Sequence, residues 1–328
     1  MNSKSPTDPA PAGADPEQRV FEPEHLRHWS FQGTSLAVLG HPVRHSISPA
    51  MHNAALARMA RTDPRFHKWC YFKFDIPPEQ LPEVLPLFHQ HRFRGINLTI
   101  PHKTEVLPLL SQIDPDARRM GAVNTLVWTP DGYEGYNTDG YGLSTATAEE
   151  PGFPLSSGPV ILLGAGGAAR AAAVQCLLNS CPELWLGNRN PERLDSLYRD
   201  LVTIRKPPTR LETFGLKDLP HDLPGRALIV NATSLGLSPE DPAPVDLASL
   251  RGDYSVYDMI YPGPGRPETA LLREARRLGF PAAHGLSMLI HQGARSLEIW
   301  SGGSVSVDAM RQAAERALAV PEGKKRRG

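Results

Sequence analysis

Hydrophobic and polar positions along the chain form a pattern that predicts strands and helices in turn. Short apolar runs predict strands over residues 34–40, 70–76, 94–100, 123–128, 160–163, 183–187, 227–230 and 254–258. Apolar residues at helical spacing predict helices over 50–60, 79–90, 104–111, 167–179 and 191–203. Strands that alternate with helices favour parallel sheets covered by helices, so the predicted fold class is α/β.

The chain is long enough for two domains of this kind. It has 328 residues, and a domain commonly holds about 100–200. One strand-like run, 34–40, opens the first half and another, 160–163, opens the second. The stretch 130–158 between them contains several Gly, Pro, Thr and Ser residues and is the natural boundary. We therefore predict two α/β domains that meet within this stretch.

One predicted strand is followed by an unexpected charged residue. In "GINLTIPHK", apolar residues ending with Ile100 alternate with Asn97 and Thr99, as in a half-buried strand. Pro101 ends this pattern, and Lys103 follows two residues later. A lysine at a rigid strand end is either a solvated charge or an aimed proton donor, and these residues alone leave both interpretations open.

Composition and charge exclude several classes of protein. Apolar residues make up 40% and charged residues 21%, and no apolar run approaches the ~20 residues that a membrane helix needs. The formal net charge of +0 indicates neither a nucleic-acid nor a membrane partner. The 3 cysteines have neither zinc-site nor redox-motif spacing, which fits reduced thiols in a cytoplasmic protein.

Both ends of the chain have the composition of tails. The beginning is rich in Pro, Ala and Asp and lacks the hydrophobic core of a signal peptide, so we predict a disordered leader over residues 1–30. A short basic cluster lies at 321–328. It fits a solvated tail better than a nucleic-acid contact, because no aromatic or basic surface accompanies it.

A glycine-rich loop in the second half has the spacing of a dinucleotide-binding turn. "ILLGAGGAAR" places Gly164, Gly166 and Ala169 in a G-x-G-x-x-A arrangement between an apolar strand and an alanine-rich helix. The first glycine makes the turn, the second admits a pyrophosphate, and the small third residue lets the helix pack on the sheet. The strand and helix on either side favour a dinucleotide site at the helix N-terminus over a bare structural turn.

The next predicted strand favours NADP over NAD. An NAD enzyme usually offers Asp or Glu to the ribose hydroxyls about 20–25 residues beyond the first glycine. This sequence has Asn188 and Arg189 at that place, with Arg193 one turn into the following helix. A guanidinium pairs with a 2′-phosphate, which a carboxylate would repel. The alternative is that both arginines are ordinary surface charges.

The run "LGHPVRHSISPAMHNAAL" contains two hydroxyls at a predicted strand-to-helix turn. Ser46 and Ser48 are two residues apart, so they can face one anionic group with the helix N-terminus behind them, or they can cap the helix. A metal site is not expected from the histidines of this run, because a proline interrupts their spacing and no cysteine or carboxylate joins them: His41, His45 and His52.

Nine short motifs together resemble those of the shikimate dehydrogenase family. In order and at the family's spacing, they are "GHPVRHSISPAMHNAA", "GINLTIPHK", "GAVNTLV", "GYNTDGYG", "GAGGAAR", "NRN", "NATSLG", "YDMIY" and "HGLSMLIHQGARSLEIW". The resemblance covers about residues 35–302. It implies a substrate-binding domain that C-terminal helices complete, with a Rossmann-type NADP-binding domain inserted between. The expected limits are 31–138, 139–284 and 285–320 for the first part, the insertion and the completing helices.

The resemblance also implies the residues of catalysis and substrate binding. The family's catalytic lysine and aspartate fall on Lys103 and Asp139, and its carboxylate-binding serines fall on Ser46 and Ser48. Four further residues are expected near the substrate, most of them at its ring hydroxyls: Thr99, Asn124, Tyr261 and Gln292.

These residue types suit the reduction of the ketone of 3-dehydroshikimate to shikimate. The reaction needs a hydride from NADPH and a proton for the developing alkoxide. The ammonium of Lys103 can stabilise that oxygen and supply the proton, while Asp139 orients it. A lysine pKa is ordinarily about 10.4, burial would lower it and a carboxylate would raise it, and the sequence leaves the balance open.

For the cofactor, the resemblance implies NADP(H) and the residues that hold it. They lie in the glycine loop, after the next strand and in two later motifs: Gly164, Ala165, Gly166, Gly167, Ala168, Asn188, Arg189, Arg193, Asn231, Thr233, Ser234, Gly285 and Met288. The expected partner is the small-molecule substrate, shikimate or 3-dehydroshikimate, and the expected assembly is a monomer or homodimer. The implied role is in chorismate and aromatic amino acid biosynthesis.

Other functions compete with this interpretation. A quinate or quinate/shikimate dehydrogenase, or an aminoshikimate relative, has the same scaffold, but quinate-preferring members often replace Ser48 by threonine and carry an acid at the cofactor strand. A non-catalytic NADP-binding sensor would have little need of both Lys103 and Asp139. A methylene-tetrahydrofolate dehydrogenase-type fold is disfavoured by the serine pair and by "NTDG".

Overall fold

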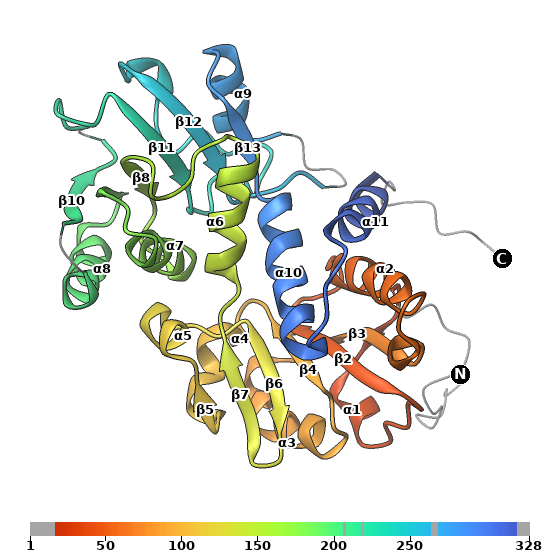
Figure 1. Cartoon of the computed structure of the whole chain (residues 1–328). Helices are drawn as coiled ribbons and strands as arrows, with labels where there is room; N and C mark the ends of the chain where they lie inside the picture. The colour runs from red at the N-terminus through yellow and green to blue at the C-terminus, as the bar shows by residue number, and fades with distance from the viewer. Residues whose placement is uncertain (1–16, 206–207, 218, 264–267, 320–328) are drawn as a thin grey trace, which may run out of the picture. The chain divides into compact units, whose positions relative to one another are not determined.

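The computed structural model describes residues 17–205, 208–217, 219–263 and 268–319. Contacts divide the chain, drawn in Figure 1, into two compact units. Among the described residues, unit 1 contains 17–118, 122–138 and 293–317, and unit 2 contains 119–121, the described part of 139–292, and 318–319. Unit 1 is therefore assembled from segments that lie on both sides of unit 2 in the sequence.

The sheet of unit 1 has seven strands in the order β1-β3-β2-β4-β6-β7-β5. Their bounds are β1 (Val20–Phe21), β2 (Thr34–Gly40), β3 (Trp69–Asp75), β4 (Gly95–Leu98), β5 (Gln112–Ile113), β6 (Thr125–Thr129) and β7 (Gly132–Tyr136). β6 runs antiparallel to both β4 and β7, whereas the other pairs are parallel. The predicted parallel pairing therefore holds for most of unit 1, and β6 is the antiparallel exception.

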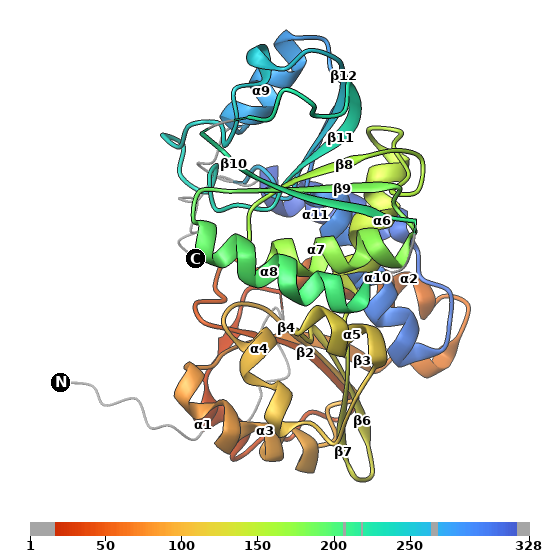
Figure 2. The same ribbon diagram turned by 90° about the vertical axis from the view of Figure 1, so that its left-hand side faces the viewer.

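Helices cover both faces of this sheet, as Figure 2 shows for α1 and α3 on one side and α2 on the other. The helices of unit 1 are α1 (Pro23–Leu26), α2 (Ser48–Met59), α3 (Leu81–Gln90), α4 (His102–Glu105), α5 (Pro115–Met120) and α11 (Val307–Ala319), with short 3₁₀ turns at η1 (Pro64–Phe66), η2 (Pro78–Gln80) and η3 (Leu107–Leu109). A further helix, α10 (Leu286–Ser301), begins in unit 2 and belongs to unit 1 from residue 293 onward. Successive side chains of a strand point to opposite faces. Accordingly, Phe74 of β3 packs edge-on against Phe88 of α3, whereas Tyr71 stacks on His52 of α2.

The start of the described chain is part of the core of unit 1. Phe21, Leu26 and Trp29 are buried, and their rings and side chains pack with those of β3 and α3. The prediction of a disordered leader up to residue 30 is therefore wrong for residues 17–30. Composition does not reveal this order, because the apolar residues that anchor the segment are few and follow a long polar stretch. Residues 1–16 and 321–328 lie outside the described residues.

Unit 2 has a parallel six-stranded sheet in the order β10-β9-β8-β11-β12-β13. The strands are β8 (Val160–Leu163), β9 (Glu183–Asn188), β10 (Arg210–Gly215), β11 (Arg226–Asn231), β12 (Asp253–Asp258) and β13 (Ala282–His284), with α6 (Asp139–Glu149), α7 (Gly167–Leu178), α8 (Pro191–Ile204), α9 (Ala270–Arg277) and the 3₁₀ turn η4 (Leu247–Ser249). Counted along the chain, the spatial order is third, second, first, fourth, fifth, sixth, which is that of a Rossmann fold. The predicted α/β class is confirmed.

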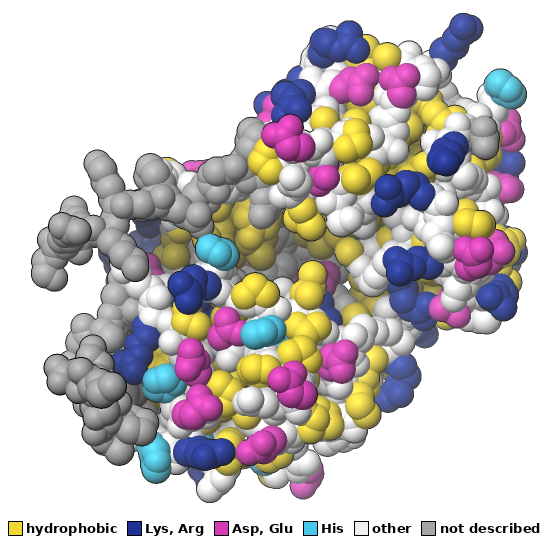
Figure 3. All heavy atoms as spheres, turned by 180° about the vertical axis from the view of Figure 1, so that it is seen from behind, with side chains coloured by type: hydrophobic (Ala, Val, Ile, Leu, Met, Phe, Trp, Pro, Cys, Tyr) yellow, Lys and Arg dark blue, Asp and Glu magenta, His cyan; other side chains and the backbone are white. Residues whose placement is uncertain are grey.

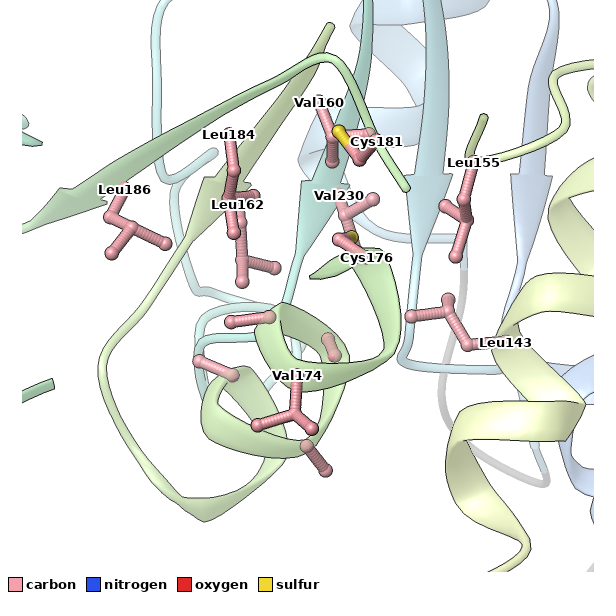
Figure 4. Close-up of a cluster of buried hydrophobic side chains, with 14 of the residues drawn as sticks. Leu143, Leu155, Val160, Leu162, Val174, Cys176, Cys181, Leu184, Leu186 and Val230 are labelled. Carbon is pink, nitrogen blue, oxygen red and sulfur yellow. The ribbon is translucent and has the colours of Figure 1, made fainter. Parts of the chain in front are cut away.

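The core of unit 2 explains why its strands are continuous apolar runs. Figure 4 shows Val174 and Cys176 of α7 beneath the strand residues Leu162, Leu184 and Val230, all of them buried. A second buried cluster on alternating strand residues includes leucines of α9. Because both faces of a parallel sheet are covered, its strands carry apolar residues at nearly every position.

Two local predictions differ from the structure. The helix expected over 104–111 is only the short α4 and a 3₁₀ turn, because Pro108 interrupts the segment. The expected boundary 130–158 contains β7 and the whole of α6, which the turn-forming residues concealed. Apolar spacing thus outweighed a helix-breaking proline in the first case, whereas turn-forming residues hid regular elements in the second.

Surface charge is mixed on the face that Figure 3 shows, where basic and acidic side chains are interspersed. Mixed charge agrees with the formal net charge of +0. In the part of the chain that the structure describes, none of the helices is both long and apolar enough to span a membrane.

Candidate active site

Sheet topology gathers several predicted site residues at one edge of unit 1. β2 and β4 are parallel, so the Ser46–Ser48 turn that follows β2 and the Thr99–Lys103 turn that follows β4 leave the sheet at the same edge. β6 is antiparallel and therefore begins at that edge, directly after Asn124. β7 runs back and ends there at Tyr136. Parallel sheets commonly bind ligands at this kind of edge.

A buried hydrogen-bond network holds Asn124 in place. The Asn124 side-chain oxygen accepts the backbone N–H of Thr138 at 2.8 Å and the hydroxyl of Thr125 at 2.9 Å. Its amide nitrogen donates to the Thr138 hydroxyl at 3.0 Å. These contacts orient the amide group, whose oxygen accepts and whose nitrogen donates. Asp139, the predicted catalytic carboxylate, follows Thr138 directly in the chain.

A second layer of polar groups lies behind Asn124. Asn97 is only 7% exposed, and its amide nitrogen lies 3.0 Å from the hydroxyl of Ser296 on α10 and 3.1 Å from the Asn124 carbonyl oxygen. Its side-chain oxygen accepts the hydroxyl of Tyr71 at 2.8 Å. Buried polar groups need such partners, because an unmade hydrogen bond inside a protein costs about 1–3 kcal/mol. Sequence reasoning missed this layer, since its members come from distant segments.

Lys103 lies at the start of the short helix α4 and is half-buried. Its carbonyl oxygen accepts the N–H of Val123 at 2.8 Å, which ties the turn after β4 to the segment that carries Asn124. The preceding His102 is fully buried, and its Nε2 lies 2.9 Å from the Ile76 carbonyl. Burial lowers the pKa of His102, so the imidazole is neutral at pH 7. The scaffold around Lys103 is thus fixed by groups other than its own ammonium.

The strand predicted over 94–100 ends at Leu98. Ile100 is 75% exposed, so the expected alternation that buried it is wrong. Thr99 donates its N–H to the Leu39 carbonyl, and its own carbonyl accepts the N–H of His102, which starts the turn toward Lys103. The chain leaves the sheet two residues earlier than the pattern predicts.

The two serines lie at the N-terminus of α2, and both are half-buried. The Ser46 hydroxyl oxygen accepts the N–H of Ser48 at 3.3 Å, a contact within the turn that leaves the Ser46 O–H as a donor. The Ser48 carbonyl lies 2.9 Å from Nδ1 of His52. Burial lowers the pKa of His52 to about 4, partly offset by this hydrogen bond, so His52 is a neutral donor that supports the turn.

In unit 2, Asp139 is the first residue of α6 and Gln292 lies on α10. The Gln292 amide nitrogen donates to the Leu289 carbonyl at 3.0 Å. These two helices are linked by His291, whose Nε2 lies 2.5 Å from a carboxylate oxygen of Glu149 at the other end of α6. Tyr261 is half-buried and follows β12. His291 thus connects α10 to α6.

The glycine loop has the shape that a pyrophosphate site requires. Gly164 has a φ of +121°, and a Cβ there would lie 2.9 Å from the Ala232 carbonyl oxygen, so only glycine fits. Added Cβ atoms at Gly166 and Gly167 would meet nothing within 4 Å, and both residues are exposed with Ala168. α7 begins here, and the first N–H groups of a helix have no partners within it. An open, glycine-lined helix N-terminus therefore suits a dinucleotide phosphate.

The residues after β9 surround the position expected for a ribose phosphate. Asn190 caps α8 by accepting the N–H of Arg193 at 2.7 Å, and the Asn188 side chain donates to the Asn190 carbonyl at 2.9 Å. Arg189 and Arg193 are both exposed. The turn is thus held by asparagines, while two guanidinium groups extend from it. This donor set fits a 2′-phosphate.

The "NATSLG" turn after β11 is stabilised by Asn231. Its two amide hydrogens are both used, by the Leu235 carbonyl at 3.1 Å and a carboxylate oxygen of Asp258 at 3.0 Å. Its oxygen accepts both the N–H and the hydroxyl of Thr233. We therefore interpret Asn231, which is fully buried, as holding the turn. Ser234 is exposed at that turn.

Asp258 is also buried, and desolvation raises its pKa against the lowering effect of hydrogen bonds from Thr269, Ile260 and Asn231. Further along, the Tyr257 hydroxyl accepts the N–H of Met288 at 3.3 Å, one turn after the buried Gly285. The predicted cofactor residues Gly285 and Met288 therefore lie at the start of α10, whose first turn is held by a side chain of β12.

Two segments of the chain match family models. Residues 38–126 match the shikimate dehydrogenase substrate binding domain, and residues 285–315 match the shikimate 5'-dehydrogenase C-terminal domain. Over 291 residues, the chain is 42% identical to the shikimate dehydrogenase (NADP(+)) of Symbiobacterium thermophilum, covering 87% of this chain and 95% of that protein. The chain belongs to the shikimate dehydrogenase family.

Solved structures of family members agree with this assignment. Shikimate 5-dehydrogenase of Thermus thermophilus, in complex with NADP(H) and shikimate, is 36% identical, has a TM-score of 0.74, and is matched over 87% of this chain and 100% of that chain. Quinate dehydrogenase of Corynebacterium glutamicum, in complex with NAD, is 26% identical with a TM-score of 0.74, over 87% of this chain and 99% of that chain. The fold is thus shared by members with different substrates and cofactors.

Proposed function

We propose that the chain is an NADP-dependent shikimate dehydrogenase, which reversibly reduces 3-dehydroshikimate to shikimate. The observation that carries this proposal is the single sheet edge in unit 1 at which the serine turn, Thr99, Lys103 and Asn124 emerge. A flat ring with a carboxylate and several hydroxyls needs this combination of neutral donors and one cation. The relatives named shikimate dehydrogenase (NADP(+)) support it.

We infer the following roles for the substrate-binding residues. Ser46 and Ser48 bind the substrate carboxylate, with the N-terminus of α2 adding its positive dipole end. Thr99, Asn124 and Gln292 bind ring hydroxyls, and Tyr261 lies along the substrate. The buried network around Asn124 fixes the orientation of its amide group. A site that hydrogen-bonds each hydroxyl discriminates strongly against analogues that lack one.

Bound NADPH supplies the hydride for the carbonyl carbon. Lys103 stabilises the alkoxide that develops on the carbonyl oxygen and gives it a proton, while Asp139 orients the ammonium and binds a neighbouring hydroxyl. The exposed loop of Gly166, Gly167 and Ala168 receives the pyrophosphate, with Ala165 in the turn before it. Arg189 and Arg193 bind the 2′-phosphate. Thr233, Ser234, Gly285 and Met288 border the rest of the cofactor. The oligomeric state, a monomer or a homodimer, stays a prediction.

A spectrophotometric assay tests the substrate and cofactor together. Shikimate and quinate are each oxidised with NADP⁺ and with NAD⁺, and kcat/KM is compared for the four pairs. We expect the highest value for shikimate with NADP⁺, because Ser48 and the arginines favour that pair. The Lys103→Ala variant, purified in parallel, controls for contaminating dehydrogenase. A higher kcat/KM for quinate with NAD⁺ would instead identify a quinate dehydrogenase.

Cofactor choice is tested at Arg189. Arg189→Ala should raise the KM for NADP⁺ much more than the KM for NAD⁺, since it removes a charged contact worth about 1.5–3 kcal/mol, or roughly 10–150-fold. Arg199→Ala is a matched control. Arg199 is also exposed, but it lies on α8, more than two turns after the helix begins. Equal effects of Arg189→Ala on the two cofactors would contradict a 2′-phosphate contact.

A further inference from the structure

The loop between β2 and α2, residues 41–47, is attached to β3 at three points. Nδ1 of His41 lies 2.6 Å from a carboxylate oxygen of Asp75, and the other oxygen of Asp75 accepts the N–H of Val43 at 3.4 Å. Nζ of Lys73 donates to the Arg44 carbonyl at 3.2 Å. The loop that carries the substrate serines is therefore bound to the sheet by two charged side chains.

Lys73 and Asp75 act from the same face of the sheet, because they are two residues apart on one strand. In the sheet they lie opposite Val38 and Gly40, the last part of β2 before the loop begins. Both side chains therefore stand beneath the path that the loop follows from β2 to α2.

Lys73 is only 5% exposed, which is unusual for a lysine. Burying an ammonium is costly unless hydrogen bonds compensate it, and an apolar residue would fill the same space without that cost. Packing alone therefore does not account for a lysine at this place. Its contact with the Arg44 carbonyl lies two residues before Ser46.

The connection from Arg44 to the serines is short and rigid. The Val43 carbonyl accepts the N–H of Ser46 at 2.9 Å, and the Ser46 hydroxyl oxygen accepts the N–H of Ser48 at 3.3 Å. A shift of the backbone at residues 43 and 44 is therefore passed to both hydroxyls.

We propose that Lys73 is a positioning residue for substrate binding, which together with Asp75 holds the loop so that Ser46 and Ser48 present their hydroxyls to the substrate carboxylate. This inference rests on the proposed role of the two serines. Lys73 does not touch the substrate and acts through the backbone of the loop. It therefore tunes affinity for the carboxylate rather than the chemical step.

Kinetics of Lys73→Met, which keeps the length of the side chain and removes its charge and donors, provide the first test. We expect the KM for shikimate to rise about tenfold, as for the loss of one charged hydrogen bond, with a smaller change in kcat and an unchanged KM for NADP⁺. Lys68→Met is the matched control, since Lys68 is exposed immediately before β3. A KM for shikimate within about twofold of the wild-type value would overturn the proposal.

A variant cycle separates this role from a general structural one. In a Ser46→Ala, Ser48→Ala background, adding Lys73→Met should raise the KM for shikimate little further, because coupled residues are not additive. The methyl ester of shikimate, which lacks the carboxylate charge, should be bound equally by Lys73→Met and wild type. A full additional tenfold loss in the serine background would show that Lys73 does not act through the serines.

Amide hydrogen exchange tests the attachment of the loop in the absence of substrate. Its result therefore does not depend on whether the proposed function is right. Lys73→Met should speed exchange in residues 41–48 while leaving α3 unchanged, because the loop loses one attachment. Asp75→Asn, at a less buried position, tests the other attachment if Lys73→Met fails to fold, with the same expected result. Unchanged amide exchange in residues 41–48 overturns the inference about Lys73. A wild-type enzyme without activity on shikimate, or a Ser46→Ala, Ser48→Ala variant with an unchanged KM for shikimate, contradicts the proposed function alone.

Discussion

Lys103→Ala should lower kcat for shikimate oxidation by about 10²–10⁴-fold, the usual contribution of a positioned acid or base, while shikimate affinity changes much less. A group engaged mainly in the transition state affects turnover more than binding. Stopped-flow and steady-state measurements of NADPH formation, together with calorimetric titration of shikimate, give the two quantities.

The structure explains why this substitution should remove chemistry without removing the scaffold. The turn at Lys103 is held by the N–H of Val123 on its carbonyl and by the contact of the His102 ring with the Ile76 carbonyl. Neither uses the ammonium. His102 cannot replace the lost acid, because burial lowers its pKa and its Nε2 is committed to that carbonyl.

Two further variants test whether Lys103 donates a proton and whether it acts together with Asp139. Lys103→Arg should restore little, because a guanidinium keeps the charge but surrenders its proton poorly. Combining Lys103→Ala with Asp139→Asn should cost less than the product of the two single losses, as expected for groups that act as a unit. Lys68→Ala, at an exposed lysine of the same unit, should leave kcat unchanged. A folded Lys103→Ala enzyme with near-normal kcat would show that Lys103 is not the catalytic acid and is only a solvated charge.

Trp300→Ala is expected to destabilise unit 1 by about 3–5 kcal/mol, the range for truncating a large buried aromatic residue. Trp300 is 1% exposed, and its indole N–H donates to the Leu126 carbonyl of β6 at 2.9 Å. Its ring lies against Gly95 of β4 so closely that a Cβ there would come within 2.3 Å of it. The residue therefore docks the end of α10 onto strands that come far earlier in the chain.

Urea unfolding followed by far-ultraviolet circular dichroism measures this loss. Trp128→Ala is the matched control, because Trp128 also donates its indole N–H to a carbonyl, that of His89, but is only partly buried. Trp128→Ala should lower the free energy of unfolding by less than Trp300→Ala does. The Trp300 variant should also raise the KM for shikimate, since Ser296, one turn earlier on α10, bonds to Asn97 and Thr125 behind Asn124. A midpoint within error of wild type would mean that α10 does not hold unit 1 together.

Local pattern determined those parts of the protein whose interactions are themselves local. The strand at 34–40 and the strand-loop-helix at 160–178 were predictable, because apolar runs, glycine spacing and helix periodicity all act over a few neighbouring residues. The α/β class followed from the alternation of such segments. The family followed from motifs that resemble known ones, and the roles of Lys103 and Asp139 stay predictions of that resemblance.

Tertiary structure decided everything that depends on a distant partner. The alternation around β4 predicts a polar Asn97 at the surface and a buried Ile100, yet Asn97 is buried among Tyr71, Ser296 and Asn124, and Ile100 is exposed. The composition of residues 1–30 predicts a disordered leader, yet Phe21, Leu26 and Trp29 are buried against side chains of β3 and α3. The attachment of Lys73 to the serine loop has no signal in local spacing. Hydrogen bonds and burial depend on which segments meet in space, and the period of one segment carries no information about the segment that will cover it.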